Sequence, residues 1–186
     1  MRFLYNFLLY LLVPILFIRL LLKQYKSRGL QNSSQKGRWK ERLGFISNYH
    51  YQTSPIWIHA VSVGEFIAVL PLVELLHKQH PDIPLVITTT THTGSDQVIK
   101  NLGNKVFHVY IPWDLPDTMA RFYKTLKPRL ALIMETEIWP NLLVQAKKKN
   151  IPVILINARL SEKSARSYQR IAEFSQSTIN HFTHLS

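Results

Sequence analysis

The chain has 186 residues, of which 46% are hydrophobic and 18% are charged, a composition typical of a folded domain rather than of a disordered chain. It contains no cysteine, which excludes disulfide bonds, thiolate metal sites and a cysteine nucleophile. The net charge of +12 is uneven, because residues 1–50 carry nine Lys or Arg and a single acidic residue, Glu41. Since this excess lies beside an apolar segment, it favours an anionic membrane surface, and not nucleic acid, as the partner.

The first predicted element is an apolar helix over residues 3–22, FLYNFLLYLLVPILFIRLLL. It is long enough to cross a bilayer, and the positive-inside rule places the Lys- and Arg-rich segment that follows it in the cytoplasm. We therefore expect residues 1–22 to be a membrane anchor. A cleaved signal peptide is disfavoured, because only Arg2 precedes the apolar core and no small-residue cleavage motif follows it. An interfacial helix remains a second interpretation, which the aromatic residues and Arg19 also suit.

Residues 23–54 are predicted to form a basic linker or a poorly packed helix, because Ser, Asn, Gln and Gly are frequent between residues 26 and 44. The segment is either a solvated tether or a contact for lipid phosphates. Trp39 suits the depth of lipid headgroups.

Residues 55–186 are predicted to form a Rossmann-like domain of the α/β class. The predicted strands are 56–61, 85–90, 106–111, 130–135 and 152–157, and the predicted helices are 65–80, 94–103, 117–127, 140–150 and 161–176. Continuous runs of Val, Ile and Leu indicate strands that are buried on both faces. Their alternation with helices predicts a parallel sheet covered on both sides. No G-x-G-x-x-G or Walker motif supports a dinucleotide or P-loop site.

Ligands of such sheets bind beyond the carboxyl ends of the strands, and all five predicted strands are followed there by polar or aromatic residues. These segments are SVGE (62–65), TTTTHTGS (88–95), YIPWDLP (110–116), METEIWPN (134–141) and NARLSEKS (157–164). Five loops that converge on one edge of the sheet predict a binding site.

Glu65 stands in the first turn of a predicted helix, just after Gly64, which permits a close backbone approach. Free N–H groups in that turn stabilise a carboxylate, so one interpretation is that Glu65 only complements the helix dipole. The other is that Glu65 is a general base, which takes a proton from an attacking hydroxyl. The four other polar strand ends favour the general base.

Glu135 and Glu137 form a second acidic pair. One could cap the helix that begins near Pro140 and the other could face positive charge developing on a sugar ring, and periodicity does not assign the roles. The hydroxyls of residues 88–95 suit either phosphate binding or strand and cap formation. His59 and His92 lack metal-ligand spacing and are expected to be packed or hydrogen-bonded.

The ordered motifs WIHAVSVGE, TTTTHTGS, YIPWDLP, ETEIWPNL and NARLSEKS, behind an apolar N-terminal segment, resemble the N-terminal half of bacterial Kdo (3-deoxy-D-manno-oct-2-ulosonic acid) transferases. The resemblance covers essentially the whole chain. It implies a GT-B glycosyltransferase fold, in which two Rossmann-like domains face a cleft. It also implies transfer of Kdo from CMP-Kdo to the lipid A precursor, lipid IVA, at the cytoplasmic face of the inner membrane, without a metal or a cofactor.

The resemblance assigns roles to residues. It implies that Glu65 is the catalytic base and that Glu135 stabilises the transition state. It implies that the acceptor is bound mainly by this domain, at the motif residues Ser62, Gly64, Thr91, His92, Thr93, Gly94, Ser95, Trp113, Glu137, Asn157, Arg159 and Lys163.

Members of the family continue into a second domain that binds CMP-Kdo, whereas this chain stops at FTHLS. We therefore expect an acceptor-binding half with negligible activity on its own. The alternative is a non-catalytic, membrane-tethered module that binds anionic lipid.

Overall fold

The computed structural model describes residues 1–26, 38–159, 168–169 and 171–186. Among the described residues before the sheet lie α1 (Arg2–Lys26) and the 3₁₀ helix η2 (Arg38–Leu43). The strands are β1 (Ile56–His59), β2 (Leu85–Thr89), β3 (Phe107–Tyr110), β4 (Leu130–Met134), β5 (Val153–Ile156) and β6 (His184–Leu185). The remaining helices are α2 (Val63–Gln79), α3 (His92–Leu102), the 3₁₀ turn η3 (Gly103–Lys105), α4 (Pro116–Leu126), α5 (Pro140–Lys148) and α7 (Ala172–Ile179).

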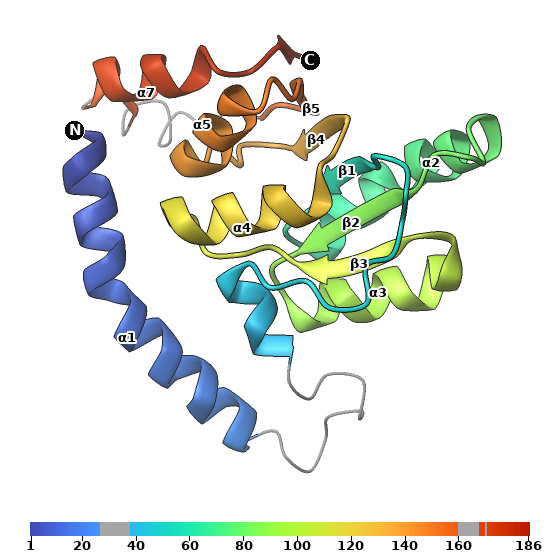
Figure 1. Ribbon diagram of the computed structural model, residues 1–186, viewed down its shortest axis with the longest axis horizontal. Coiled ribbons are helices and arrows are strands. Elements are labelled where there is room, and N and C mark those ends of the chain that lie inside the picture. Colours follow the sequence, from blue (N-terminus) through green and yellow to red (C-terminus); the bar gives the residue numbers. More distant parts are fainter. Residues whose placement is uncertain (27–37, 160–167, 170) are drawn as a thin grey trace.

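The six strands form one sheet in the order β3-β2-β1-β4-β5-β6, and every pair is parallel (Figure 1). This confirms the predicted Rossmann-like α/β fold, including all five predicted strands, each somewhat shorter than expected. The chain moves outward from β1 to β3 and then returns to place β4 on the other side of β1. The strand order therefore reverses between β1 and β4, which is the position where ligands of such sheets bind.

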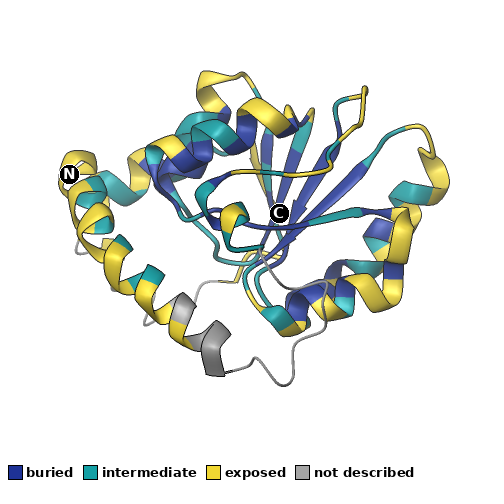
Figure 2. Ribbon diagram, turned by 60° about the horizontal axis from the view of Figure 1, so that its bottom comes forward, coloured by how far each residue is buried: buried dark blue, intermediate teal, exposed yellow. Residues whose placement is uncertain are grey.

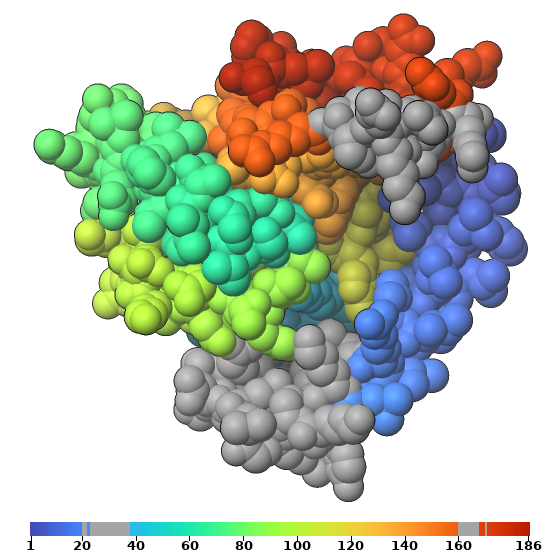
Figure 3. Space-filling view, turned by 180° about the vertical axis from the view of Figure 1, so that it is seen from behind, coloured from blue at the N-terminus to red at the C-terminus, as the bar shows by residue number. Residues whose placement is uncertain are grey.

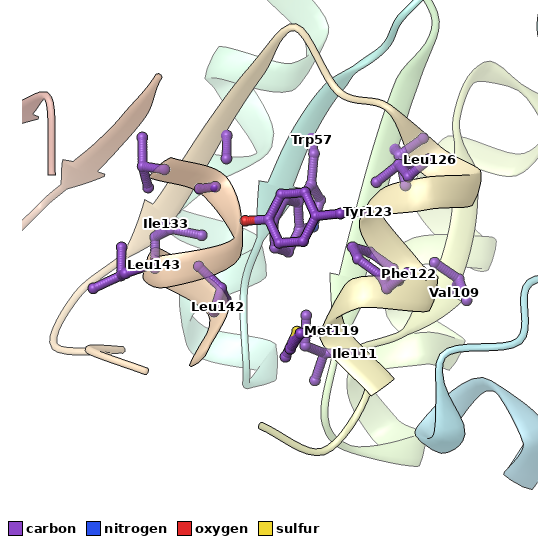
Figure 4. Close-up of a cluster of buried hydrophobic side chains, with 14 of the residues drawn as sticks. Trp57, Val109, Ile111, Met119, Phe122, Tyr123, Leu126, Ile133, Leu142 and Leu143 are labelled. Carbon is purple, nitrogen blue, oxygen red and sulfur yellow. The ribbon is translucent and has the colours of Figure 1, made fainter. Parts of the chain in front are cut away.

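Helices cover both faces of the sheet because successive side chains of a strand point to opposite faces. Trp57 of β1 packs with α4, and its ring lies 5.0 Å from that of Phe122 and 5.5 Å from that of Tyr123. Leu142 and Leu143 of α5 complete this cluster (Figure 4). The next residue, Ile58, belongs to a second cluster formed with the following residues of α2 and α3: Phe66, Val69, Val73, Val98 and Leu102. Burial is accordingly greatest along the strands (Figure 2).

Residues 38–54 are part of the folded domain, although residues 23–54 were predicted as a linker. Arg42 of η2 is buried and donates hydrogen bonds to the carbonyl oxygens of Ile111 and Thr90. The guanidinium groups of Arg38 and Arg42 each lie 4.4 Å from the ring centre of Tyr110. Glu41 accepts a hydrogen bond from the Tyr110 backbone N–H at 2.7 Å. The charges of η2 thus fasten it to the edge strand β3.

The C-terminal end differs from its prediction. Half of the predicted helix over 161–176, namely 161–167 and 170, lies outside the described residues, and the described helix α7 covers Ala172–Ile179. β6 was not predicted, because two exposed residues carry no hydrophobic pattern.

α1 is a 25-residue helix that lies along one side of the domain (Figures 1 and 3). Its segment Arg2–Arg19 is long and apolar enough to cross a membrane, and none of it is buried inside the structure. Length and composition alone do not distinguish a spanning helix from an interfacial one.

Candidate active site at the carboxyl ends of the strands

Glu65 is held by the start of α2. Ser62 is the N-cap, and its hydroxyl accepts a hydrogen bond from the Glu65 backbone N–H at 3.3 Å and donates one to Glu65 Oε1 at 3.0 Å. The other carboxylate oxygen, Oε2, accepts from the Val61 backbone N–H at 2.8 Å. This is a variant of the capping box, in which side chains satisfy the free N–H groups of the first turn. Only 8% of Glu65 is exposed. Its carboxylate is therefore fixed in direction at the end of β1.

Glu135 directly follows β4, the strand beside β1. Its backbone N–H donates to the carbonyl oxygen of Ile156 at 3.0 Å, which extends the ladder between β4 and β5 by one residue. Its φ angle is +55°, in the left-handed region that costs an L-residue about 1–2 kcal/mol. Asn157, directly after β5, has a φ angle of +53°. Such backbone strain is concentrated at functional sites.

Glu137 lies within electrostatic reach of both other carboxylates. Burial raises the pKa of the Glu137 carboxyl, and the charges of Glu65 and Glu135 raise it further. A hydrogen bond from Trp139 Nε1 to Glu137 Oε2, 2.6 Å long, opposes this rise. Across the described residues, these carboxylates are not grouped as the ligands of a metal ion would be. The ends of β1 and β4 thus form an acidic edge made of Glu65, Glu135 and Glu137.

Residues of the TTTTHTGS segment form the cap of α3 and also contact the neighbouring strand end. Thr91 caps α3, because its hydroxyl accepts the Gly94 backbone N–H at 3.1 Å. A Cβ atom at Gly94 would lie 3.0 Å from the Thr91 hydroxyl oxygen, so any other residue would require this cap to shift by a few tenths of an ångström. Thr93 is exposed, and His92 Nδ1 lies 2.8 Å from the Tyr110 hydroxyl.

Ser95 is fully buried, and its hydroxyl accepts a hydrogen bond from Arg38 at 3.1 Å. Its partner is therefore η2, and any contact with an acceptor molecule would require η2 to move.

The remaining predicted residues are spread along the same edge. Trp113 is half-buried, and its backbone N–H donates to the carbonyl oxygen of Arg42 at 3.0 Å. Asn157 and Arg159 are exposed after β5, and the Thr136 hydroxyl donates to the carbonyl oxygen of Arg159. Lys163 lies outside the described residues.

Two further residues of this edge, Asp114 and Tyr168, are not among the predicted catalytic and acceptor-binding residues, although Asp114 belongs to the predicted strand-end segment YIPWDLP. Asp114 is 8% exposed and accepts the backbone N–H groups of Asn141 at 3.0 Å and Leu142 at 2.8 Å, which lie in the first turn of α5. Burial raises the pKa of its carboxyl to about 6. Burial raises the pKa of the Tyr168 hydroxyl, and the charge of nearby Glu137 raises it further. Neither contact is visible in the local sequence pattern.

His59 is packed, as expected. It is fully buried, and its Nδ1 lies 2.8 Å from the Thr88 hydroxyl. Burial lowers the pKa of its ring to about 4, so the ring is neutral at pH 7.

The parallel sheet with its site at the reversal of strand order defines the class of the protein, a Rossmann-like domain of the GT-B kind. Among solved structures, two UDP-N-acetylglucosamine 2-epimerases show this fold. One has a TM-score of 0.51 and 19% identity and covers 72% of this chain and 40% of its own. The other, a putative enzyme from Listeria monocytogenes, has a TM-score of 0.50 and 16% identity over 73% of this chain and 40% of its own.

The family profile described as 3-deoxy-D-manno-octulosonic-acid transferase (kdotransferase) matches residues 37–186. The chain belongs to this family. It is 42% identical over 173 residues to the 3-deoxy-D-manno-octulosonic acid transferase of Haemophilus influenzae. It is 37% identical over 165 residues to a probable mitochondrial transferase of Arabidopsis thaliana.

These matches cover 91% and 89% of this chain but only 39% and 36% of the two relatives. The chain therefore spans less than half of the length of the relatives that it matches.

Proposed function

We propose that the chain is the acceptor-binding half of an inverting glycosyltransferase, which transfers Kdo from CMP-Kdo to the lipid A precursor, lipid IVA, in lipopolysaccharide biosynthesis. The observation that carries the proposal is the geometry of Glu65. The first turn of α2 fixes this carboxylate, at the point where the strand order reverses and inside a motif of the family.

In the proposed reaction, Glu65 accepts the proton of an acceptor hydroxyl while that oxygen attacks the anomeric carbon of Kdo. The bond from that carbon to the phosphate oxygen of CMP breaks at the same time, and its electron pair leaves with CMP. A single displacement of this kind inverts the anomeric centre. Positive charge develops on the sugar ring in the transition state, and in this proposal the Glu135 carboxylate stabilises it.

The proposed location is the cytoplasmic side of the inner membrane, with α1 as the attachment. An apolar helix with four basic and no acidic residues supports attachment to an anionic membrane.

The test is Glu65→Gln in the full-length enzyme. Glutamine also serves at this position of a capping box, so the melting temperature should change little. Turnover should fall by about 100-fold or more, because loss of a general base typically costs that much. Glu74→Gln, on the exposed part of the same helix, is the matched control and should keep full activity. Near-normal turnover of Glu65→Gln would refute the assignment of the base.

The second candidate is a non-catalytic, membrane-tethered module that binds anionic lipid, which the basic and exposed α1 favours. This candidate predicts that Glu65→Gln leaves lipid binding unchanged and that the full-length protein transfers no Kdo.

A further inference from the structure

α1 presents two different faces. The residues that are half-buried against the domain recur every three or four positions, and they are Tyr5, Asn6, Leu9, Val13, Leu16 and Phe17. The opposite face exposes large apolar side chains, with Phe3 exposed by 85% and Ile15 by 62%. The others on that face are Leu4, Phe7, Leu8, Leu11, Leu12, Ile18 and Leu22. A continuous apolar surface of this kind needs a partner to cover it.

Polar groups hold the other face of α1 to the domain. The Tyr5 hydroxyl donates to Asp114 Oδ2 at 2.9 Å, and the Tyr10 hydroxyl donates to Asp117 Oδ1 at 2.7 Å. The Asn141 side-chain amide donates to Asn6 Oδ1 at 2.8 Å. We call these three hydrogen bonds the α1 clasp.

Aromatic contacts extend the attachment at both ends. The Tyr5 ring lies 5.8 Å from Phe174 of α7, and the Phe17 ring lies 5.6 Å from Trp39 of η2. At about 1.5 Å per residue, the contacts from Tyr5 to Phe17 extend over roughly 18 Å of the helix. α1 is therefore attached along about half of its length.

The clasp and a membrane-spanning orientation exclude each other. A spanning helix would bury Tyr5, Asn6 and Tyr10 in hydrocarbon. Their partners Asp114, just before α4, and Asn141, in the first turn of α5, are buried and cannot follow them there, because they also hold the main chain of the domain. If α1 crosses the bilayer, all three hydrogen bonds of the clasp must be broken.

We propose that α1 lies flat in the surface of an anionic phospholipid bilayer, clasped to the domain, with its exposed apolar face in the lipid. This inference rests on the proposed membrane location and specifies its geometry. Charge complementarity identifies the partner, because Arg2, Arg19, Lys23 and Lys26 are the only charged residues of α1 and all are basic. Interfacial helices combine such an apolar face with basic residues.

The flat orientation also brings the candidate site to the membrane. The clasp contacts Asp114, Asp117 and Asn141, which lie at the starts of α4 and α5 and so at the carboxyl ends of the strands. The acidic edge is at the same end of the sheet. A lipid-borne acceptor would meet it without leaving the bilayer.

The test is the immersion depth of spin labels on α1 of the full-length protein, bound to vesicles of phosphatidylethanolamine and phosphatidylglycerol. The chain has no cysteine, so single-cysteine variants carry one label each. Leu4→Cys, Leu11→Cys and Ile18→Cys are seven residues apart on the exposed face, and Thr125→Cys, on the exposed side of α4, is the reference in water.

A flat helix places the three α1 labels at equal depth, and the Thr125→Cys label stays in water. A spanning helix places the Leu11→Cys label about 10 Å deeper than the other two, because seven residues rise about 10 Å. That second profile would overturn the flat orientation and leave the membrane location intact.

Two further measurements separate the remaining possibilities. Absence of all labels from lipid, together with a dimer in sedimentation, would mean that a second copy covers the apolar face, and both the flat orientation and the membrane location would fail.

Neutral phosphatidylcholine vesicles should bind the protein more weakly by about fivefold per basic residue at the surface, and equal binding would contradict the charge argument. Kdo transfer by the same preparations tests the proposed activity independently.

The clasp can be tested directly with Tyr5→Phe/Tyr10→Phe, which removes two of its hydroxyl groups and keeps the rings. The distance distribution between labels at Leu11→Cys and Thr125→Cys should broaden in this variant. The control Tyr51→Phe, at an exposed tyrosine, should leave it unchanged. An unchanged distribution in the double variant would show that the hydroxyl groups do not hold α1.

Discussion

Glu65 and Glu135 follow neighbouring strands, but the chain holds them in different ways. Glu65 lies in a favourable cap with both carboxylate oxygens bonded. Glu135 lies in a left-handed backbone conformation that glycine would adopt at lower cost. A strained position that keeps a glutamate is consistent with a requirement for its carboxylate.

Glu135→Gly should therefore make the domain more stable and the enzyme less active. Glycine relieves the strain of the positive φ angle, but it also increases the conformational entropy of the unfolded chain. The net effect should be a rise of about 0.5–1 kcal/mol in the free energy of unfolding. Urea unfolding and a transfer assay of the full-length enzyme measure the two effects.

Asn157→Gly is the matched control for Glu135→Gly, since asparagine tolerates the left-handed region and should gain little. Glu135→Ala should lose activity without the gain in stability. A Glu135→Gly enzyme with full activity would show that the carboxylate is not needed.

Asp114 should make stability depend on pH. Burial raises its pKa to about 6, so the folded protein keeps a proton that the unfolded chain, with a pKa near 3.8, has already released. The free energy of unfolding should therefore fall by about 2–3 kcal/mol as the pH rises from about 4 to about 6, and this contribution should be constant above that range.

Urea unfolding of Asp114→Asn across that pH range should lack this slope, relative to the wild type. Asp82→Asn, at an exposed loop residue, should retain it. An unchanged slope in Asp114→Asn would assign the pH dependence to other groups.

At the scale of single residues, the sequence predicted where a residue lies in a helix or strand better than it predicted that residue's hydrogen-bond partners. Ser62 and Glu65 could be placed at the start of a helix, because capping acts between residues three apart. The contacts of Asp114, His59 and Ser95 join segments that are far apart in the chain, and no local pattern contains that information.

At the scale of elements, η2 is the main departure from the sequence prediction. Its Ser, Asn, Gln and Gly content predicted a basic linker or a poorly packed helix. In the structure, Arg42 is covered by Tyr110 and by two carbonyl acceptors, and burial lowers its pKa to about 10, so it remains charged at pH 7. The strands of the sheet were easier to predict, because a run of apolar residues buried on both faces is a local feature.

Arg42→Lys should destabilise the domain by about 1–2 kcal/mol. Lysine cannot donate to both carbonyl groups in the same planar geometry and does not stack on Tyr110. Thermal or urea unfolding measures the change. Lys40→Met, at the exposed neighbouring position, should alter stability by less than about 0.5 kcal/mol. Equal effects of the two substitutions would mean that η2 is not fastened through Arg42.

At the scale of the whole molecule, the alternation of strands and helices predicted a parallel sheet and the edge that carries the site. It did not predict that β4 pairs with β1, which places the two strand ends that lead to Glu65 and to Glu135 side by side. It also left the orientation of α1 open, because hydrophobicity alone does not determine which face of a helix meets the domain.

The 173 residues of this chain that match the Haemophilus influenzae relative correspond to 39% of it, so we expect catalysis to need the remainder of a full-length enzyme. We expect the purified 186-residue protein to bind vesicles that contain lipid IVA and to form no Kdo-containing product from CMP-Kdo. Product formation would place the donor site within these residues. Failure to bind such vesicles would refute the acceptor role.

Asp114 connects α1 with the start of α5. One carboxylate oxygen, Oδ2, accepts both the Tyr5 hydroxyl of α1 and the backbone N–H of Asn141, where the segment carrying Glu135 and Glu137 enters α5. If α1 leaves the domain, this oxygen loses one of its two donors and becomes open to water. Asp114 thus couples α1 to the start of α5, and departure of α1 is expected to loosen the loop that carries Glu135 and Glu137.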